Sequence, residues 1–262
     1  MFKIGDLVTR ESYKHDVIFV ITDIDENNIH YLKGLNIRLH ADSEEGDLKL
    51  YNKNVDDSKE ETEFLDRIKS ITNIEDRDEY FYLPGKILHI DADSDYLNKC
   101  LDYYKNIKIM AVGKIEKEDI VPNKIQDWIY EYSPNIVVIT GHDAYYRKGR
   151  KSESESYKNS FYFIESIKAV RRIEMSQDKL IIIAGACQSN YEELIKAGAN
   201  FASSPKRINI HALDPAIVAS SMALSDSSKE IDLKKILENT KYGSSGIGGI
   251  MTKGTMHIGY PR

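Results

Sequence analysis

The features that most constrain the fold of this sequence are two continuous apolar runs, each followed directly by a reactive side chain. The first run covers residues 136–141 and leads to His142, and the second covers residues 180–186 and leads to Cys187. Short runs rich in β-branched residues are typical of strands buried in a parallel sheet. In an open α/β sheet, ligands and chemistry gather beyond the carboxyl ends of the strands. The pattern therefore predicts a cysteine nucleophile and a histidine base at one sheet edge.

Composition narrows the class of protein. The chain has 262 residues, room for one large domain plus a small one, and a formal net charge of −6 from 36 basic and 42 acidic side chains. Without a basic excess to neutralise phosphates, no nucleic-acid partner is indicated. The amino terminus is charged and lacks the apolar core of a signal peptide, and no run reaches the roughly 18 apolar residues of a membrane helix. We therefore expect a cytoplasmic globular protein without a membrane partner.

The two cysteines have different surroundings. So few cysteines exclude a disulfide scaffold and indicate a reducing compartment. Cys100 repeats with Leu97, Leu101 and Tyr104 at helical spacing, which predicts an inert cysteine packed as a small hydrophobe. Cys187 is thus the candidate nucleophile.

Three segments are predicted along the chain. Residues 1–52 contain strand-like runs at 5–10, 17–24 and 29–34 with a turn at 25–28, which suggests a small SH3-like β-barrel for folding, docking or substrate recruitment. Residues 53–83 form a charged linker with a short amphipathic helix that uses Phe64, Leu65, Ile68 and Ile71. Residues 84–262 alternate strands and helices, as α/β domains do.

The α/β segment is predicted to hold a mostly parallel sheet flanked by helices. Its expected strands cover residues 86–91, 107–113, 136–140 and 180–184, with further short strands at 200–204 and 207–211. Its expected helices cover residues 94–105, 125–132, 160–174 and 191–197, and another begins at Asp214-Pro215 with Asp214 as N-cap. Pro134 and Gly198 end two of these helices. The glycine-rich tail, residues 243–259, is predicted to form a strand pair or hairpin.

The Cys187 thiol can act as a nucleophile only if a nearby group helps it to lose its proton. A thiolate attacks carbonyls far better than a thiol, so Cys187 needs a base or a positive field. His142 is the best-placed base, and the helix expected after Cys187 adds its dipole. Backbone N–H groups of Cys187 and of a residue near His142 are candidates for the oxyanion hole. The alternative is a core cysteine with an unrelated turn histidine.

The remaining histidines are weaker candidates. His211 follows a possible strand and is the second choice as base, whereas His89 lies within a strand and is expected to be structural. No HxH, HExxH or CxxC spacing is present, so we expect neither a metal site nor another cofactor.

Carboxylates also follow the predicted strands. Asp91 and Asp93 leave the first strand of the α/β segment, Asp143 follows the histidine, and Asp214 precedes a helix. Each is a candidate to orient the imidazole, to bind a basic substrate side chain, or simply to cap a helix.

The motifs together resemble one family, the YabG sporulation-specific peptidases of spore-forming bacteria. The resemblance covers nearly the whole chain and rests on separate motifs within residues 2–6, 33–39, 136–144, 180–189, 198–207, 211–215 and 246–250. More distantly, the strand–His and strand–Ala-Cys arrangement is similar to caspase-like cysteine peptidases, whose histidine lies about 50 residues before an Ala-Cys pair.

The resemblance implies a cysteine endopeptidase of the mother cell or spore coat that cleaves spore-coat and germination-protein precursors after arginine. By the same resemblance Cys187 is the nucleophile, His142 the base, and the backbone N–H groups of Cys187 and Asp143 the oxyanion hole. Caspase-like enzymes usually carry glycine where this chain has Asp143. Arginine preference requires a carboxylate that pairs with the guanidinium, and Asp91, Asp93, Asp143 and Asp214 are the candidates.

Two further hypotheses accompany this interpretation. The long polar loop at residues 145–156 contains Arg147 and Arg150 and is predicted to be a lid or a place of self-cleavage. The rival functions are another cysteine amidohydrolase or amidotransferase acting on small amides, and a non-enzymatic spore-coat binding module.

Overall fold

The computed structural model describes residues 2–51, 62–68, 79–146 and 156–261, and the chain divides into two compact units, Met1–Leu65 and Asp66–Arg262. Most of the predicted linker lies outside the described residues, and so do residues 147–155 of the loop predicted as a lid or self-cleavage segment. Within that linker, residues 62–68 are helical as predicted, and Phe64 and Ile68 are buried.

The first unit contains one five-stranded antiparallel sheet. Its strands are β1 (Leu7–Arg10), β2 (Phe19–Ile24), β3 (Ile29–Gly34), β4 (His40–Glu44) and β5 (Leu48–Leu50), in the order β4-β3-β2-β1-β5. Alternate residues such as Phe19 and Ile21 point into its core, as the period of two in a strand requires. The three predicted strands are confirmed. The predicted closed barrel is not, because β4 and β5 are the two edges of the sheet and do not pair in the described residues.

The second unit is built on a six-stranded sheet. Its strands are β7 (Ile87–Asp91), β8 (Ala111–Ile115), β9 (Ile136–Thr140), β10 (Ile181–Ala184), β11 (Phe201–Ser203) and β12 (Ile247–Gly249). The order is β12-β11-β10-β9-β7-β8, and only β12 runs antiparallel to its neighbour. Strands β7, β9 and β10 are buried along their whole length, which explains why β9 and β10 are almost entirely apolar. The predicted mostly parallel α/β sheet is confirmed.

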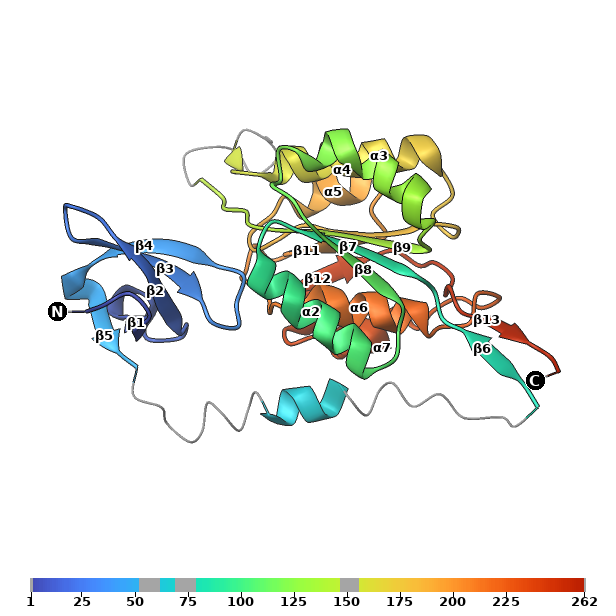
Figure 1. Ribbon diagram of the computed structural model, residues 1–262, viewed down its shortest axis with the longest axis horizontal. Coiled ribbons are helices and arrows are strands. Elements are labelled where there is room, and N and C mark those ends of the chain that lie inside the picture. Colours follow the sequence, from blue (N-terminus) through green and yellow to red (C-terminus); the bar gives the residue numbers. More distant parts are fainter. Residues whose placement is uncertain (1, 52–61, 69–78, 147–155, 262) are drawn as a thin grey trace. The chain divides into compact units, whose positions relative to one another are not determined.

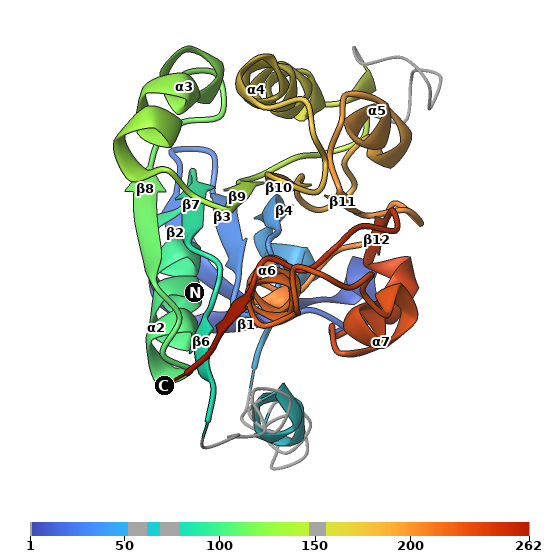
Figure 2. The same cartoon turned by 90° about the vertical axis from the view of Figure 1, so that its right-hand side faces the viewer.

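Helices cover both faces of this sheet. They are α2 (Ser94–Asn106), α3 (Val121–Tyr132), α4 (Ser160–Ile173), α5 (Tyr191–Lys196), α6 (Asp214–Ala223) and α7 (Leu233–Glu238). Helices α3, α4 and α5 lie on one face, and α2, α6 and α7 lie on the other (Figures 1 and 2). Helix α6 is buried on almost every side, which fits its nearly uniform apolar sequence. No helix among the described residues is long and apolar enough to cross a membrane.

Local signals explain several helix ends. The Asp93 carboxylate accepts the N–H groups of Asp95 and Tyr96 and so caps α2. Ser133, before Pro134, takes a left-handed conformation (φ 45°) that ends α3, and Gly198 (φ 114°) follows α5 as predicted. Asp214 differs from its prediction, because it is the first helical residue of α6 and its side chain does not cap that helix.

Three other predictions need correction. Strand β8 begins at Ala111 rather than at residue 107, because α2 runs to Asn106 and the chain turns through Lys108 (φ 59°). Residues 207–211 form a loop, with Arg207 at φ 56°. The tail does not pair with itself: β12 joins β11, and β13 (His257–Gly259) pairs with β6 (Phe81–Leu83). The tail segments pair with strands from earlier in the chain, and the sequence of the tail does not show which strands those are.

Candidate active site

The site lies where the strand order reverses. Strand β8 lies on one side of β7, and the chain then crosses back to place β9 and β10 on the other side. The crevice beyond the carboxyl ends at such a point is the usual ligand site of an open α/β sheet. Asp91 and Thr140 are paired across β7 and β9, and Ile139 is paired with Ala184 of β10. The residues that follow these three strands therefore meet at one edge, as the sequence predicted.

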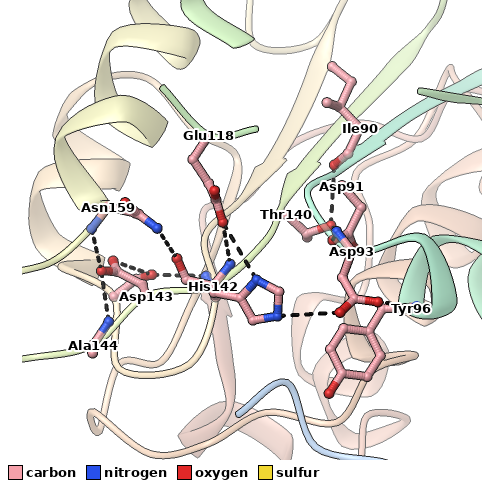
Figure 3. A network of polar contacts seen from close by, with 12 residues as sticks. Ile90, Asp91, Asp93, Tyr96, Glu118, Thr140, His142, Asp143, Ala144 and Asn159 are labelled. Carbon is pink, nitrogen blue, oxygen red and sulfur yellow. Dashed lines mark hydrogen bonds and ion pairs between the residues drawn. The ribbon is translucent and has the colours of Figure 1, made fainter. Parts of the chain in front are cut away.

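His142 stands between two carboxylates. Its Nδ1 is 3.7 Å from Glu118 Oε1, and its Nε2 is 3.7 Å from Asp93 Oδ2 (Figure 3). The Tyr96 ring lies beside the imidazole, with 6.0 Å between the ring centroids. The His142 side chain is 19% exposed, so these contacts are largely shielded from solvent. The imidazole thus has a carboxylate beside each of its two ring nitrogens.

Glu118 is the residue that sequence reasoning missed. It follows β8 and accepts a 2.8 Å hydrogen bond from the backbone N–H of His142. Burial raises the pKa of Glu118, but the hydrogen bonds and charge of His142 outweigh burial and hold the pKa below its ordinary value. A Cβ on Gly141 would lie 2.5 Å from Glu118 Oε1, so the glycine makes room for this carboxylate. In the sequence, Gly141 could have indicated that another group lies close to the backbone here, but a glycine does not identify which residue that is.

Asp91 and Asp93 form a linked pair at the end of β7. Asp91 accepts hydrogen bonds from the Thr140 hydroxyl (2.6 Å) and from the backbone N–H of Asp93 (2.9 Å). His89 is buried next to them, within hydrogen-bond distance of Thr140 Oγ1 and the Tyr104 hydroxyl, 3.0 Å each. His89 is therefore structural, as predicted, and it supports the carboxylate end of the site.

Cys187 is fully buried in a tight turn after β10. The backbone N–H of Ile210 donates to its Sγ at 3.3 Å. The next residue, Gln188, has φ 59°, and its own N–H donates to Ser204 Oγ at 3.0 Å. A non-glycine residue in this region costs on the order of 1 kcal/mol or more, so the surrounding bonds hold the turn in a strained form. The loop at residues 207–211, predicted as a strand, contributes the donor to the sulfur.

Asp143 points away from the crevice. Asp143 is 6% exposed as a residue, and its carboxylate accepts hydrogen bonds from four groups of this chain: the N–H groups of Ala144 and Asn159 and the hydroxyls of Ser160 and Ser189. Burial raises the pKa of Asp143, and these hydrogen bonds only partly offset it. Its backbone N–H donates no hydrogen bond within the described part of the chain.

The other predicted residues lie deeper or have local partners. Asp214 is fully buried and accepts the N–H groups of His211 (3.0 Å) and Lys241 (2.8 Å). His211, the second choice as base, is buried, and its Nδ1 accepts the N–H of Leu213. Cys100 is buried on α2, and its thiol is 3.4 Å from the Ala212 carbonyl oxygen, which fits the predicted core cysteine.

Comparison with known proteins gives concordant matches. Residues 3–261 match the family described as YabG peptidase U57. The chain is also 39% identical to the sporulation-specific protease YabG of Bacillus subtilis (strain 168), and the alignment covers 99% of this chain and 98% of that protein.

Proposed function

The chain belongs to the YabG family of sporulation-specific proteases, and we propose that it is a caspase-like cysteine endopeptidase that cleaves after arginine. Its proposed substrates are spore-coat and germination-protein precursors, in the mother cell or on the forming coat. The observation that carries the proposal is that His142 and Cys187 follow the neighbouring parallel strands β9 and β10, on loops joined by the 2.9 Å Ser189–Asp143 hydrogen bond.

The proposed reaction uses groups of this chain, the peptide substrate and one water molecule. His142 takes the proton of Cys187, and the thiolate attacks the peptide carbonyl carbon. The imidazolium then gives that proton to the leaving amine as the C–N bond breaks. Water, deprotonated by His142, attacks the thioester and releases the new carboxylate and the thiol. The Ile210 N–H, which points at Sγ, supports the negative sulfur.

The backbone N–H groups of Cys187 and Asp143 are the proposed oxyanion hole. The Asp143 side chain is turned into the protein, where it bonds to Ser160 and Ser189. This orientation supports the proposed role, because the carboxylate does not compete with the backbone N–H for the substrate oxygen. In this proposal, Asp143 with its side chain turned inward takes the place of the glycine that caspase-like enzymes usually carry after the histidine. Two N–H groups aimed at the developing oxyanion lower the barrier of acyl transfer.

Asp93 is the proposed arginine-binding carboxylate. It follows β7 at the point where strand order reverses, and its Oδ2 lies 3.7 Å from Nε2 of His142, the proposed base. The other three candidates, Asp91, Asp143 and Asp214, are less suited, because both carboxylate oxygens of each accept hydrogen bonds from the chain itself. A guanidinium pairs best with a carboxylate through two parallel hydrogen bonds, which such internal bonds oppose.

A peptide assay with full-length protein tests the proposal. We expect cleavage of a fluorogenic peptide after arginine but not after glutamine, with a loss of about 1000-fold or more in Cys187→Ala and His142→Ala. Cys100→Ala, the matched cysteine control, should stay within about twofold of the parent. Asp93→Asn should raise KM for the arginyl peptide. Cleavage that survives Cys187→Ala would refute the nucleophile, and release of ammonia from free glutamine would favour an amidotransferase.

A further inference from the structure

Asp143 adjoins the proposed base, yet its carboxylate is buried away from the crevice. We propose that Asp143 is a positioning residue, whose carboxylate holds the loop of His142 and the loop of Cys187 in the geometry that the reaction needs. This inference rests on the proposed function, because it assigns a task to a residue beside the Cys–His pair.

The first carboxylate oxygen holds the loop of His142 itself. Oδ1 of Asp143 accepts the backbone N–H of Ala144 at 2.9 Å and that of Asn159 at 2.8 Å. In addition, the Asn159 side-chain amide donates to the His142 carbonyl oxygen at 2.7 Å. The segment that carries the base is thereby attached to the start of α4, a buried and regular element.

The second carboxylate oxygen reaches the loop of the nucleophile through two serines. Oδ2 of Asp143 accepts the hydroxyls of Ser160 (2.5 Å) and Ser189 (2.9 Å). The Ser189 hydroxyl in turn accepts the N–H of Ala186 at 2.9 Å, and the Ser160 hydroxyl accepts the N–H of Asn190 at 2.8 Å. Each serine therefore bridges the carboxylate to a backbone N–H, one on either side of Cys187.

The chemistry of the bridge requires an ionised carboxylate. A carboxylate only accepts hydrogen bonds and has about four acceptor positions, and here four donors fill them. Each serine hydroxyl has one proton, which it donates to the Asp143 carboxylate, while its oxygen accepts a hydrogen bond from a backbone N–H. Asparagine at position 143 would place an NH2 donor against these two protons, so both bridges would have to rearrange.

The expected consequence is catalytic as well as structural. A displacement of about 1 Å between reacting groups can cost about 100-fold in rate. Loss of one partner of a buried hydrogen bond also costs stability, so the kinetics are compared in variants shown to be folded. The bridge does not touch the carboxylate proposed to bind the arginine side chain, and the one substrate-binding group it carries, the Asp143 N–H, is proposed to act on the oxyanion that develops during the reaction. Its loss should therefore act on kcat and on the reactivity of the thiol, and not on KM.

Serine variants test the bridge with the smallest change. In Ser189→Ala and Ser160→Ala we expect kcat for the arginyl peptide to fall about 10- to 100-fold, with KM within about threefold of the parent. Alkylation of Cys187 by iodoacetamide at pH 7, followed by peptide mass spectrometry, should slow in parallel. Asp143→Asn should show the largest loss. Ser220→Ala on α6 is the matched control, because that hydroxyl is equally buried and bonds to Ile217 and Tyr103, outside both loops.

Two results would overturn the inference. One is kcat and alkylation within about twofold of the parent in folded Ser189→Ala and Ser160→Ala. The other is a raised KM with kcat retained, which would assign Asp143 to substrate binding. If Asp143→Asn fails to fold, the serine variants decide the question alone. Failure of the proposed function is a separate outcome, since it would appear as parent activity that survives Cys187→Ala.

Discussion

Replacing Glu118 by glutamine removes a charge beside the His142 imidazole and keeps the shape of the side chain. The carboxylate oxygen is 3.7 Å from Nδ1, and both side chains are less than one-fifth exposed. At that separation two unit charges attract by about 1 to 4 kcal/mol for effective dielectric constants between about 80 and 20. Asp93 keeps one carboxylate at Nε2, so the loss falls toward the lower half of that range. We expect kcat/KM to fall about 10- to 100-fold, since 1.4 kcal/mol is about one factor of ten.

The assay compares Glu118→Gln with a matched change on the same loop. The Glu116 side chain is also partly buried, at 20% exposed, but its ion pair is with Lys124. Glu116→Gln should therefore keep the parent kcat/KM for the arginyl peptide. Equal rates for Glu118→Gln and the parent would show that the charge at position 118 does not assist the imidazole, and the reasoning would fail.

The same variant has a defined effect on acid stability. Because the pKa of Glu118 is lowered in the folded state, its carboxylate adds stability above its ordinary pKa, and that stability is lost as pH falls through the folded value. Glu118→Gln should therefore be less stable than the parent near neutral pH, and the difference should shrink in acid. Urea unfolding at a series of pH values measures it.

Three other changes have clear expected outcomes. Gly141→Ala should displace Glu118 and lower kcat/KM as Glu118→Gln does, and the double variant should lose little more, as kinetics of all three will show. Arg171→Met should cost about 3 kcal/mol in urea unfolding, because its guanidinium bonds to backbone carbonyls and to Asn200, which would lose their donor. Asp143 has a raised pKa, so its folded form loses stability as pH rises through that value, and Asp143→Asn should remove this slope from the pH series.

Much of the fold was predictable because local and tertiary forces agree. Strands β9 and β10 are buried on both faces, and they consist almost entirely of β-branched residues because every position must pack in the core. Helix α2 carries its cap, Asp93, and its apolar face in consecutive turns. Signals of this kind depend on residues close in sequence, so the chain reveals them without a structure.

The errors fall where pairing partners are distant. The glycine-rich tail has strand character, but β12 and β13 join strands that lie far earlier in the chain. Residues 207–211 have the apolar alternation of a strand, yet left-handed Ser204 and Arg207 bend the chain so that Ile210 reaches Cys187. Which of several compatible partners a short segment takes is decided by packing, and the segment itself carries no record of it.

For the candidate site, the sequence alone determined which residues follow the buried strands, and therefore that His142, Cys187 and the carboxylates of β7 lie at one sheet edge. The direction of each side chain was decided only by the tertiary structure. Glu118 reaches His142 from a different strand end. Asp143 turns inward because two serines and the Asn159 N–H from other segments supply its donors, together with the N–H of the adjacent Ala144. A buried carboxylate turns to where its hydrogen-bond donors lie, and those donors come together only when the chain has folded.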